Sequence, residues 1–242
     1  MSKPVVYCCL NASLSPSIAA LGTLENVRHE AMIQGIGCIM YATSGSGAGF
    51  LDASKFAYHF IKNTEATHLM FLCDDAIFPQ NAIVKLVTDD KDIVHPIYRK
   101  RDGFKSQPAI YLREPDRPHF IEYMKNGTLV QTDFAASHGM LIKRHVIEAM
   151  MKHYTNLNWY DHGFEDEVCG LFMPEIQPDK ELRMDDWIFS QRARALGFEV
   201  WADFSVKLLH RSIDIWLEFG DPDKMNYTET TNTEIASLIH RG

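Results

Sequence analysis

The sequence predicts an α/β fold with one mostly parallel central sheet flanked by helices. Three observations indicate it. Apolar runs of strand length alternate with stretches of helical periodicity through the first hundred residues, as in strand–helix–strand units. Polar or acidic residues directly follow the predicted strands, and ligands gather at the carboxyl ends of parallel strands. The 242 residues are 46% hydrophobic, which suffices for one domain with a sizeable core.

The first half alternates predicted strands with predicted helices. Continuous apolar runs, typical of strands buried on both faces, predict strands at 5–10, 36–43, 68–73 and 93–95. Apolar residues at helical spacing predict helices at 18–34, 51–63 and 80–87. The glycine-rich stretch 44–49 is interpreted as a flexible loop near a ligand or as a phosphate-binding loop. The Lys-Ser/Thr pair of a P-loop does not follow it, which favours the flexible loop.

The second half is less regular. In chain order we expect a hairpin at 107–118, a strand pair within 129–142, a helix at 143–153, an aromatic and acidic loop at 156–167, a helix at 185–196 and a strand at 198–202. Gly197 ends the last helix, and a polar tail runs from about residue 213. Neither an internal repeat nor a low-complexity linker divides the chain. We therefore expect one domain with two functional halves.

Charge and cysteine content narrow the function classes. The net charge of −8 argues against a broad basic face for nucleic acid, although Tyr98–Arg101 is a local basic patch, interpreted as a solvated turn or a diphosphate contact. The five cysteines are odd in number and form no C-x-x-C pair, which favours reduced thiols in a cytosolic protein. No signal-peptide pattern opens the chain, and no run of about 18 apolar residues occurs. We expect a cytoplasmic protein without a membrane span.

Two adjacent carboxylates, Asp74 and Asp75, follow the third predicted strand. Like charges a few ångströms apart destabilise each other, so a pair at a strand end favours a bound cation such as Mg²⁺ or Mn²⁺. The alternative is that the two acids cap the helix that begins near Gln80 or line a solvated turn.

A second acid pair, Asp185 and Asp186, opens the predicted helix at 185–196. One acid there is accounted for by helix capping and the helix dipole, and the other can serve as a general base if it faces a cleft.

His210 ends an apolar run, where a hydrogen-bonded edge residue and a metal ligand are both consistent with the pattern. The acidic loop 161–167 is interpreted as an exposed loop or as a second metal site.

Four segments together resemble the small family-2-like glycosyltransferases of the GT-A fold, a type that bacteria and phages encode. The segments are EATHLMFLCDD at 65–75 with Phe78-Pro79, DKDIV at 90–94 with Tyr98 and Lys100, HGMLIKR at 138–144, and DDWIFSQRARALG at 185–197 continued by VWAD at 200–203 and His210. The last is the most specific, because its acids, aromatic residue, Arg, Gly and His occur in the family's order and spacing. The resemblance implies a GT-A fold over 1–212, with a Rossmann-like nucleotide-sugar-binding half to about residue 100, an acceptor and catalytic half at 101–212, and a tail at 213–242.

The resemblance also implies roles for the metal and catalytic residues. Asp75 matches the last Asp of the D-x-D element, which binds Mn²⁺ or Mg²⁺, while Asp74 occupies the middle position and Cys73 replaces the first Asp. His210 matches the histidine that completes the metal site. Asp186 matches the general base of inverting members, and Asp185 is its neighbour.

The remaining site residues are expected around the two substrates. For the nucleotide-sugar donor they are Asn11, Thr43, Asp74, Asp75, Lys100 and Arg101; for the acceptor or sugar pocket they are His138, Gly139 and Trp187. Ala53-Ser54 stands where many relatives carry Arg-Asn, so donor contacts in the first third of the chain are not transferred from the family.

The function implied is metal-dependent transfer of a hexosyl or pentosyl group from a nucleotide sugar, expected to be a UDP-sugar, to an acceptor hydroxyl. Inversion is the expected outcome, and retention is the alternative. The acceptor is a 5-hydroxymethyl base of phage DNA, which would place the protein in the host cytoplasm, or a saccharide or glycan. A binding module without turnover, which the Cys73 replacement would make easier, and a nucleotidyltransferase are the alternatives.

Overall fold

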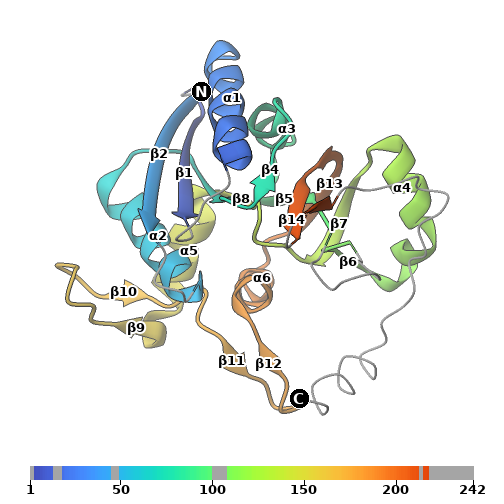
Figure 1. The fold of residues 1–242 in the computed structure, drawn as a ribbon. Coiled ribbons are helices and arrows are strands. Elements are labelled where there is room, and N and C mark those ends of the chain that lie inside the picture. Colours follow the sequence, from blue (N-terminus) through green and yellow to red (C-terminus); the bar gives the residue numbers. More distant parts are fainter. Residues whose placement is uncertain (1–2, 13–17, 45–48, 100–107, 213–214, 218–242) are drawn as a thin grey trace.

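The computed structural model describes residues 3–12, 18–44, 49–99, 108–212 and 215–217. One central sheet runs through this part of the chain, with helices packed on both of its faces (Figure 1). None of the helices described there is long and apolar enough to cross a membrane.

The central sheet of the described residues has eight strands in the order β2-β1-β3-β8-β5-β13-β7-β6. Their bounds are β1 Val5–Ala12, β2 Gly37–Ser44, β3 His68–Cys73, β5 Ile93–Ile97, β6 Tyr111–Leu112, β7 Leu129–Phe134, β8 Leu141–Lys143 and β13 Val200–Lys207. Strand β1 is parallel to β2 and to β3, and β5 is parallel to β13. The short strand β8 is antiparallel to both β3 and β5 and joins them. Strands from both halves of the chain therefore form one sheet.

The helices cover the sheet because its strands are apolar on both faces. The helices are α1 Ile18–Ile33, α2 Gly49–Asn63, α3 Ala82–Thr88, α4 Phe120–Asn126, α5 Arg144–His153 and α6 Asp185–Ala195. In β1, Val6 and Cys8 belong to the core with α1 and α3, whereas Tyr7 and Cys9 belong to the core with α2, α5 and α6. This alternation is the period of two that a strand imposes. Helix α4 packs on β6, β7 and β13 in a third, smaller core (Figure 1).

Short elements complete the described part of the chain. They are 3-10 helices at Glu114–His119 and Thr155–Leu157 and the strands β4 Ala76–Ile77, β9 Asn158–Trp159, β10 Val168–Cys169, β11 Glu175–Ile176, β12 Leu182–Arg183, β14 Leu209–Ser212 and β15 Ile215–Leu217. Strand β14 pairs with β4 and with β15.

The predicted α/β class and mostly parallel sheet are confirmed. Two local predictions were wrong. The expected hairpin at 107–118 is replaced, in its described part, by the two-residue strand β6 and a 3-10 helix, and Leu112 pairs with Thr132 of β7. The strands predicted within 129–142 exist as β7 and β8, but each pairs with other strands. Strand β15 also continues the fold beyond residue 213, where a tail was expected; most of that tail lies outside the described residues.

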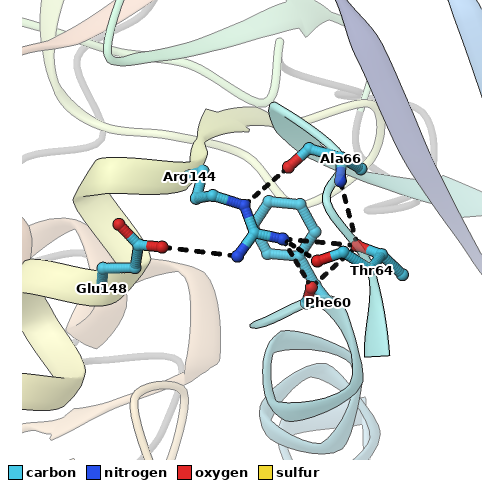
Figure 2. Close-up of polar contacts among 5 residues, drawn as sticks. All are labelled: Phe60, Thr64, Ala66, Arg144 and Glu148. Carbon is cyan, nitrogen blue, oxygen red and sulfur yellow. Dashed lines mark hydrogen bonds and ion pairs between the residues drawn. The ribbon is translucent and has the colours of Figure 1, made fainter. Parts of the chain in front are cut away.

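Arg144 joins α2, β3 and α5 (Figure 2). Its guanidinium donates hydrogen bonds to the backbone oxygens of Phe60, Thr64 and Ala66, and it lies 4.6 Å from the centre of the Phe60 ring. The carbonyls at the end of a helix lack partners within the helix, so an arginine there satisfies them. Arg144 thus fixes the end of α2 and the start of β3.

Candidate functional site

A cavity of about 280 Å³ opens at the carboxyl ends of β1 and β3. It is lined by Cys9, Asn11, Gly49, Ala53, Phe56, Phe71, Leu72, Cys73, Asp74, Asp75, Ser137, His138, Met140, Phe172, Asp185 and Asp186. Both acid pairs of the sequence therefore lie in one cavity, although 110 residues separate Asp75 from Asp185. Its size is close to the lower end of small-molecule sites, about 300 Å³.

The first acid pair lies in the turn between β3 and β4. Asp74 is buried, and the side chain of Asp75 is 25% exposed. Strand β4 pairs with β14 so that Ala76 lies opposite His210. This pairing brings His210, far along the chain, next to Asp75.

Two histidines approach the two carboxylate oxygens of Asp75. His138 Nε2 lies 3.4 Å from Oδ1, and His210 Nε2 lies 3.7 Å from Oδ2. The Nδ1 of His210 is 2.8 Å from the backbone oxygen of Arg99, which can only accept a hydrogen bond, so this nitrogen carries the proton. In the neutral ring, the Nε2 lone pair then faces the carboxylate. Such an arrangement suits a cation between them or a protonated ring.

Three side chains have the spacing of a metal site. One ligand atom each of Cys73, Asp75 and His138 lies within 4.8 Å of the other two, and all three residues are partly buried. Sulfur, oxygen and nitrogen donors on three separate backbone positions fit a divalent cation with open coordination positions. Sequence reasoning had assigned Asp75 to the metal but not Cys73 or His138. Met70 of β3 pairs with Leu141 of β8. This pairing places the loop before β8 at the end of β3, and His138 in that loop therefore lies near Asp75.

The second acid pair begins α6, and contacts of that helix fix its position. The backbone N–H of Trp187 donates to Asp186 Oδ1. The buried Ser190 hydroxyl donates to the backbone oxygen of Asp186 and accepts from the N–H of Ala135. Arg192, also buried and in the last turn, donates to the backbone oxygens of Gly170, Leu171 and Met173 and to Glu175, so both ends of the helix are tied to neighbouring segments.

Tyr98 packs against both histidines. Its ring lies 4.7 Å from that of His138 and 5.3 Å from that of His210. Burial raises the pKa of Tyr98 well above its usual value, and the nearby charges of Asp186 and Cys73 add to the rise. The hydroxyl therefore stays protonated. The interpretation of Tyr98–Arg101 as a solvated turn was wrong for Tyr98, which is buried.

Part of the cavity lining is apolar. Phe71 meets Phe172 edge to face at 5.2 Å, and Phe172 stacks on Phe189 at 4.4 Å. Because Phe189 belongs to α6, this packing ties the apolar lining to the helix that begins with the second acid pair. A cavity lined by both carboxylates and aromatic rings suits a ligand with both charged and apolar parts.

Other predicted residues lie beside the cavity or apart from it. Asn11 lines it and donates to Asp52. Thr43 lines a separate hollow of about 270 Å³ with Tyr41, Asp52, Lys55, Phe56, His59 and Phe164. Gly139 lies in the chain between the lining residues His138 and Met140. Its φ is +80°, and a Cβ at this position would clash with the ring of Pro96. Trp187 is outside the lining and stacks on Phe134 at 4.6 Å. Lys100 and Arg101 lie outside the described residues.

Comparisons with known proteins give similarity of structure only. No protein-family model and no curated protein matches the chain. The crystal structure of A197 from STIV matches with a TM-score of 0.52 and 13% identity over 91% of each chain. GalNAc-T7 with UDP, GalNAc and Mn²⁺ matches with a TM-score of 0.49 and 9% identity over 86% of this chain and 44% of that one. The inositol-1-phosphate CTP transferase from T. maritima matches with a TM-score of 0.41 and 12% identity over 100% of this chain and 98% of that one. The first similarity shows a shared fold; the other two are too weak to support an argument.

Proposed function

We propose that the protein is a glycosyltransferase that moves a sugar from a nucleotide-sugar donor, a UDP-sugar in the first instance, to an acceptor hydroxyl with inversion. The observation that carries the proposal is the meeting of two acid pairs in one cavity at the carboxyl ends of parallel strands. Such a reaction needs two separate functions, one for the departing diphosphate and one for the attacking hydroxyl. Each acid pair can supply one of them.

Asp75 is the residue for the diphosphate side. A carboxylate repels a diphosphate directly, so the proposal requires a divalent cation, Mn²⁺ or Mg²⁺ in the first test, held by Asp75 with His138 or His210 close by. When bound, the cation stabilises the negative charge of the leaving nucleoside diphosphate. Asp74 is buried beside it, and we propose that it contributes to the same donor site.

Asp186 is the residue for the hydroxyl side. In the proposed step the acceptor oxygen forms a bond to the anomeric carbon while the bond from that carbon to the phosphate oxygen breaks. The electron pair leaves with the nucleoside diphosphate, and the hydroxyl proton goes to the Asp186 carboxylate. The contacts of Ser190 and Arg192 hold α6 so that this carboxylate stays in the cavity. Asp185 is the neighbouring candidate for the general base. Its Oδ2 lies 3.6 Å from the position that a Cβ on Gly49 would occupy.

The experiment is a donor panel with the full chain. Purified protein with Mn²⁺ or Mg²⁺ is incubated with several sugar nucleotides without acceptor, and nucleoside diphosphate is measured. We expect slow release from one donor. Mass spectrometry then follows transfer to hydroxymethylated DNA and to saccharide acceptors, which separates the two acceptor classes.

Three results would contradict the proposal in different ways. Release of pyrophosphate in place of nucleoside diphosphate would indicate nucleotidyl transfer. Metal-dependent thermal stabilisation by a donor without any turnover would indicate a binding module. Absence of both release and thermal stabilisation with every donor would leave the glycosyltransferase proposal without support.

A further inference from the structure

The donor atoms at the end of β3 are unusual for a magnesium or manganese site. Cys73 is the last residue of the strand, Asp75 lies in the following turn, and His138 lies in the loop before β8. Their ligand atoms lie within 4.8 Å of one another. A tetrahedral zinc site with metal–ligand bonds of about 2.0–2.3 Å needs donor separations of roughly 3.3–3.8 Å. His138 Nε2 and Asp75 Oδ1, 3.4 Å apart, already have such a separation, and the other pairs need to close by at most about 1.5 Å, which side-chain rotation can supply.

The surroundings hold the imidazole in place. The ring of His138 contacts the rings of both Tyr98 and His210, at centroid distances of 4.7 and 4.8 Å. Its Nδ1 is 3.3 Å from the Ser137 hydroxyl, while Nε2 points to Asp75. A histidine ligand whose second nitrogen has a hydrogen-bond partner is the usual arrangement around protein-bound zinc. His210, with Nδ1 held by the Arg99 backbone oxygen, directs its own Nε2 to the other oxygen of Asp75, 3.7 Å away.

The chemistry of these donors selects among cations. Mg²⁺ and Mn²⁺ prefer carboxylate, carbonyl and water oxygens, whereas thiolate and imidazole favour Zn²⁺ and Co²⁺. A Cys, His and Asp set offers one oxygen donor against one sulfur and one nitrogen. The Cys73 thiolate therefore makes this donor set less suited to Mg²⁺ and Mn²⁺ and better suited to Zn²⁺ and Co²⁺.

We propose that Cys73, Asp75 and His138 form a thiolate-containing cation site that binds Zn²⁺ or Co²⁺, with coordination positions left open for a ligand. On binding, the Cys73 thiol loses its proton to solvent and its sulfur becomes a metal ligand. The inference rests on the positions of these donor atoms and not on the proposed function, because cation binding is measured without any sugar nucleotide.

The test is a titration of the metal-free full chain with Co²⁺, followed by absorption spectroscopy. A thiolate bound to Co²⁺ gives a charge-transfer band in the near ultraviolet, and tetrahedral Co²⁺ gives intense visible bands. We expect both, and we expect Zn²⁺ to abolish them by displacing Co²⁺. Zn²⁺ binds more tightly than Mn²⁺ at most sites with nitrogen and oxygen donors, so the ratio of their affinities does not test the thiolate; the charge-transfer band does.

Two variants and two controls complete the design. Cys73→Ser should lose the charge-transfer band and bind Zn²⁺ at least about 100-fold more weakly, with Mn²⁺ affinity little changed. His138→Ala should weaken Co²⁺ binding and shift the visible bands. Cys38→Ser, on β2, and His145→Ala, with its exposed ring on α5, should behave like the wild type.

A wild-type Co²⁺ spectrum without a charge-transfer band would overturn the inference, and this result needs no variant to fold. An equal band in Cys73→Ser would overturn it as well. The charge-transfer band without donor turnover would support the cation site and contradict the proposed glycosyl transfer. Donor turnover without the band would support glycosyl transfer and contradict the cation site.

Discussion

At the scale of single residues, Gly139 sets the position of His138 through its backbone. Its φ is +80°, in the region that L side chains rarely adopt, and a Cβ placed there would lie 2.5 Å from Pro96 Cγ and 3.1 Å from a ring carbon of Phe78. Glycine alone has neither the steric penalty nor the clash. The residue lies next to the imidazole that faces Asp75, so a change here affects the site as well as stability.

Gly139→Ala is therefore expected to lower the free energy of unfolding by about 2–4 kcal/mol, from the backbone strain and the overpacking together. Urea unfolding measures it. The control is Gly22→Ala within α1, where an added Cβ meets nothing within 4 Å. That variant should gain about 0.5–1 kcal/mol, because alanine is the better helix former. Equal effects at the two positions would contradict the account of Gly139.

Sequence reasoning at this scale singled out the two acid pairs, Asn11 and His138, which line the cavity, and His210, which lies near Asp75, but it missed the aromatic lining residues Phe56, Phe71 and Phe172. Apolar runs and strand ends can be recognised locally, so Asp74 and Asp75 could be singled out. His138 was assigned to the acceptor side, because the pairing of β3 with β8 that brings it to Asp75 leaves no local signal. Trp187 was expected in the acceptor pocket, yet it packs on Phe134 and Tyr111.

At the scale of elements, Arg144 connects α5 to the end of α2 and the start of β3 (Figure 2). Its side chain is 20% exposed and satisfies three backbone oxygens that have few other partners at a helix end. Because β3 leads directly to Asp74 and Asp75, this junction supports the cavity from outside it.

Arg144→Ala should lower the free energy of unfolding by about 2–4 kcal/mol, since partly buried carbonyls lose charged hydrogen-bond donors. The free energy of unfolding of Arg144→Lys should lie between those of Arg144→Ala and the wild type, because an ammonium group cannot reproduce the planar fork of hydrogen bonds that a guanidinium donates. Chemical denaturation compares them with Arg28→Ala on α1. Arg28 makes an exposed ion pair with Glu25, which solvent screens, so its loss should change the free energy of unfolding far less. A loss at Arg144 as small as that at Arg28 would show that the junction does not stabilise the fold.

A second junction, between α3 and β13, depends on pH. Lys85 lies 2.6 Å from Asp89 and 3.2 Å from the fully buried Asp203. Burial raises the pKa of Asp89 from 3.8 to about 6, and the charge of Asp203 adds to the rise while Lys85 opposes it. A carboxyl with a raised pKa binds its proton more tightly in the folded state. Its contribution to stability is therefore greatest below the unfolded pKa, near pH 4, and is lost as the pH rises to about 6.

Asp89→Asn removes this titration. The free energy of unfolding of the wild type, relative to that of the variant, should fall between pH 4 and pH 6.5 and level off above it. Urea unfolding at several pH values measures the difference, and groups common to both proteins cancel from it. A difference that stays constant with pH, or rises, would contradict the raised pKa.

Elements of the first half were predicted well because their periodicity is local and strong. The strand pairing of the second half was predicted less well. Strand pairing depends on contacts between distant segments, so β7 and β8 were expected to pair with each other but pair with β13 and β3. Pro115 and Pro118 shape the 3-10 helix at 114–119, where a turn of a hairpin was expected. The helix α4 that follows was not predicted.

At the scale of the whole molecule, the two halves of the chain complete one site. The first half supplies the strand ends with Cys73, Asp74 and Asp75, and the second supplies His138, Asp185, Asp186 and, through the β4–β14 pairing, His210. Neither half carries both acid pairs. The proposed division of labour follows from this arrangement: Asp75 serves donor binding, whereas Asp186 serves the transfer step alone.

The most direct test of that division measures donor binding and turnover on the same preparations of Asp75→Asn and Asp186→Asn. By calorimetry, Asp75→Asn should weaken metal-dependent donor binding by about 10–100-fold, whereas Asp186→Asn should leave the Kd within about twofold and lower kcat by about 10²–10⁴. Asp166→Asn, an exposed acid paired with Lys62, is the matched control and should change neither. Normal donor binding by Asp75→Asn, or near-normal turnover by Asp186→Asn, would contradict the account.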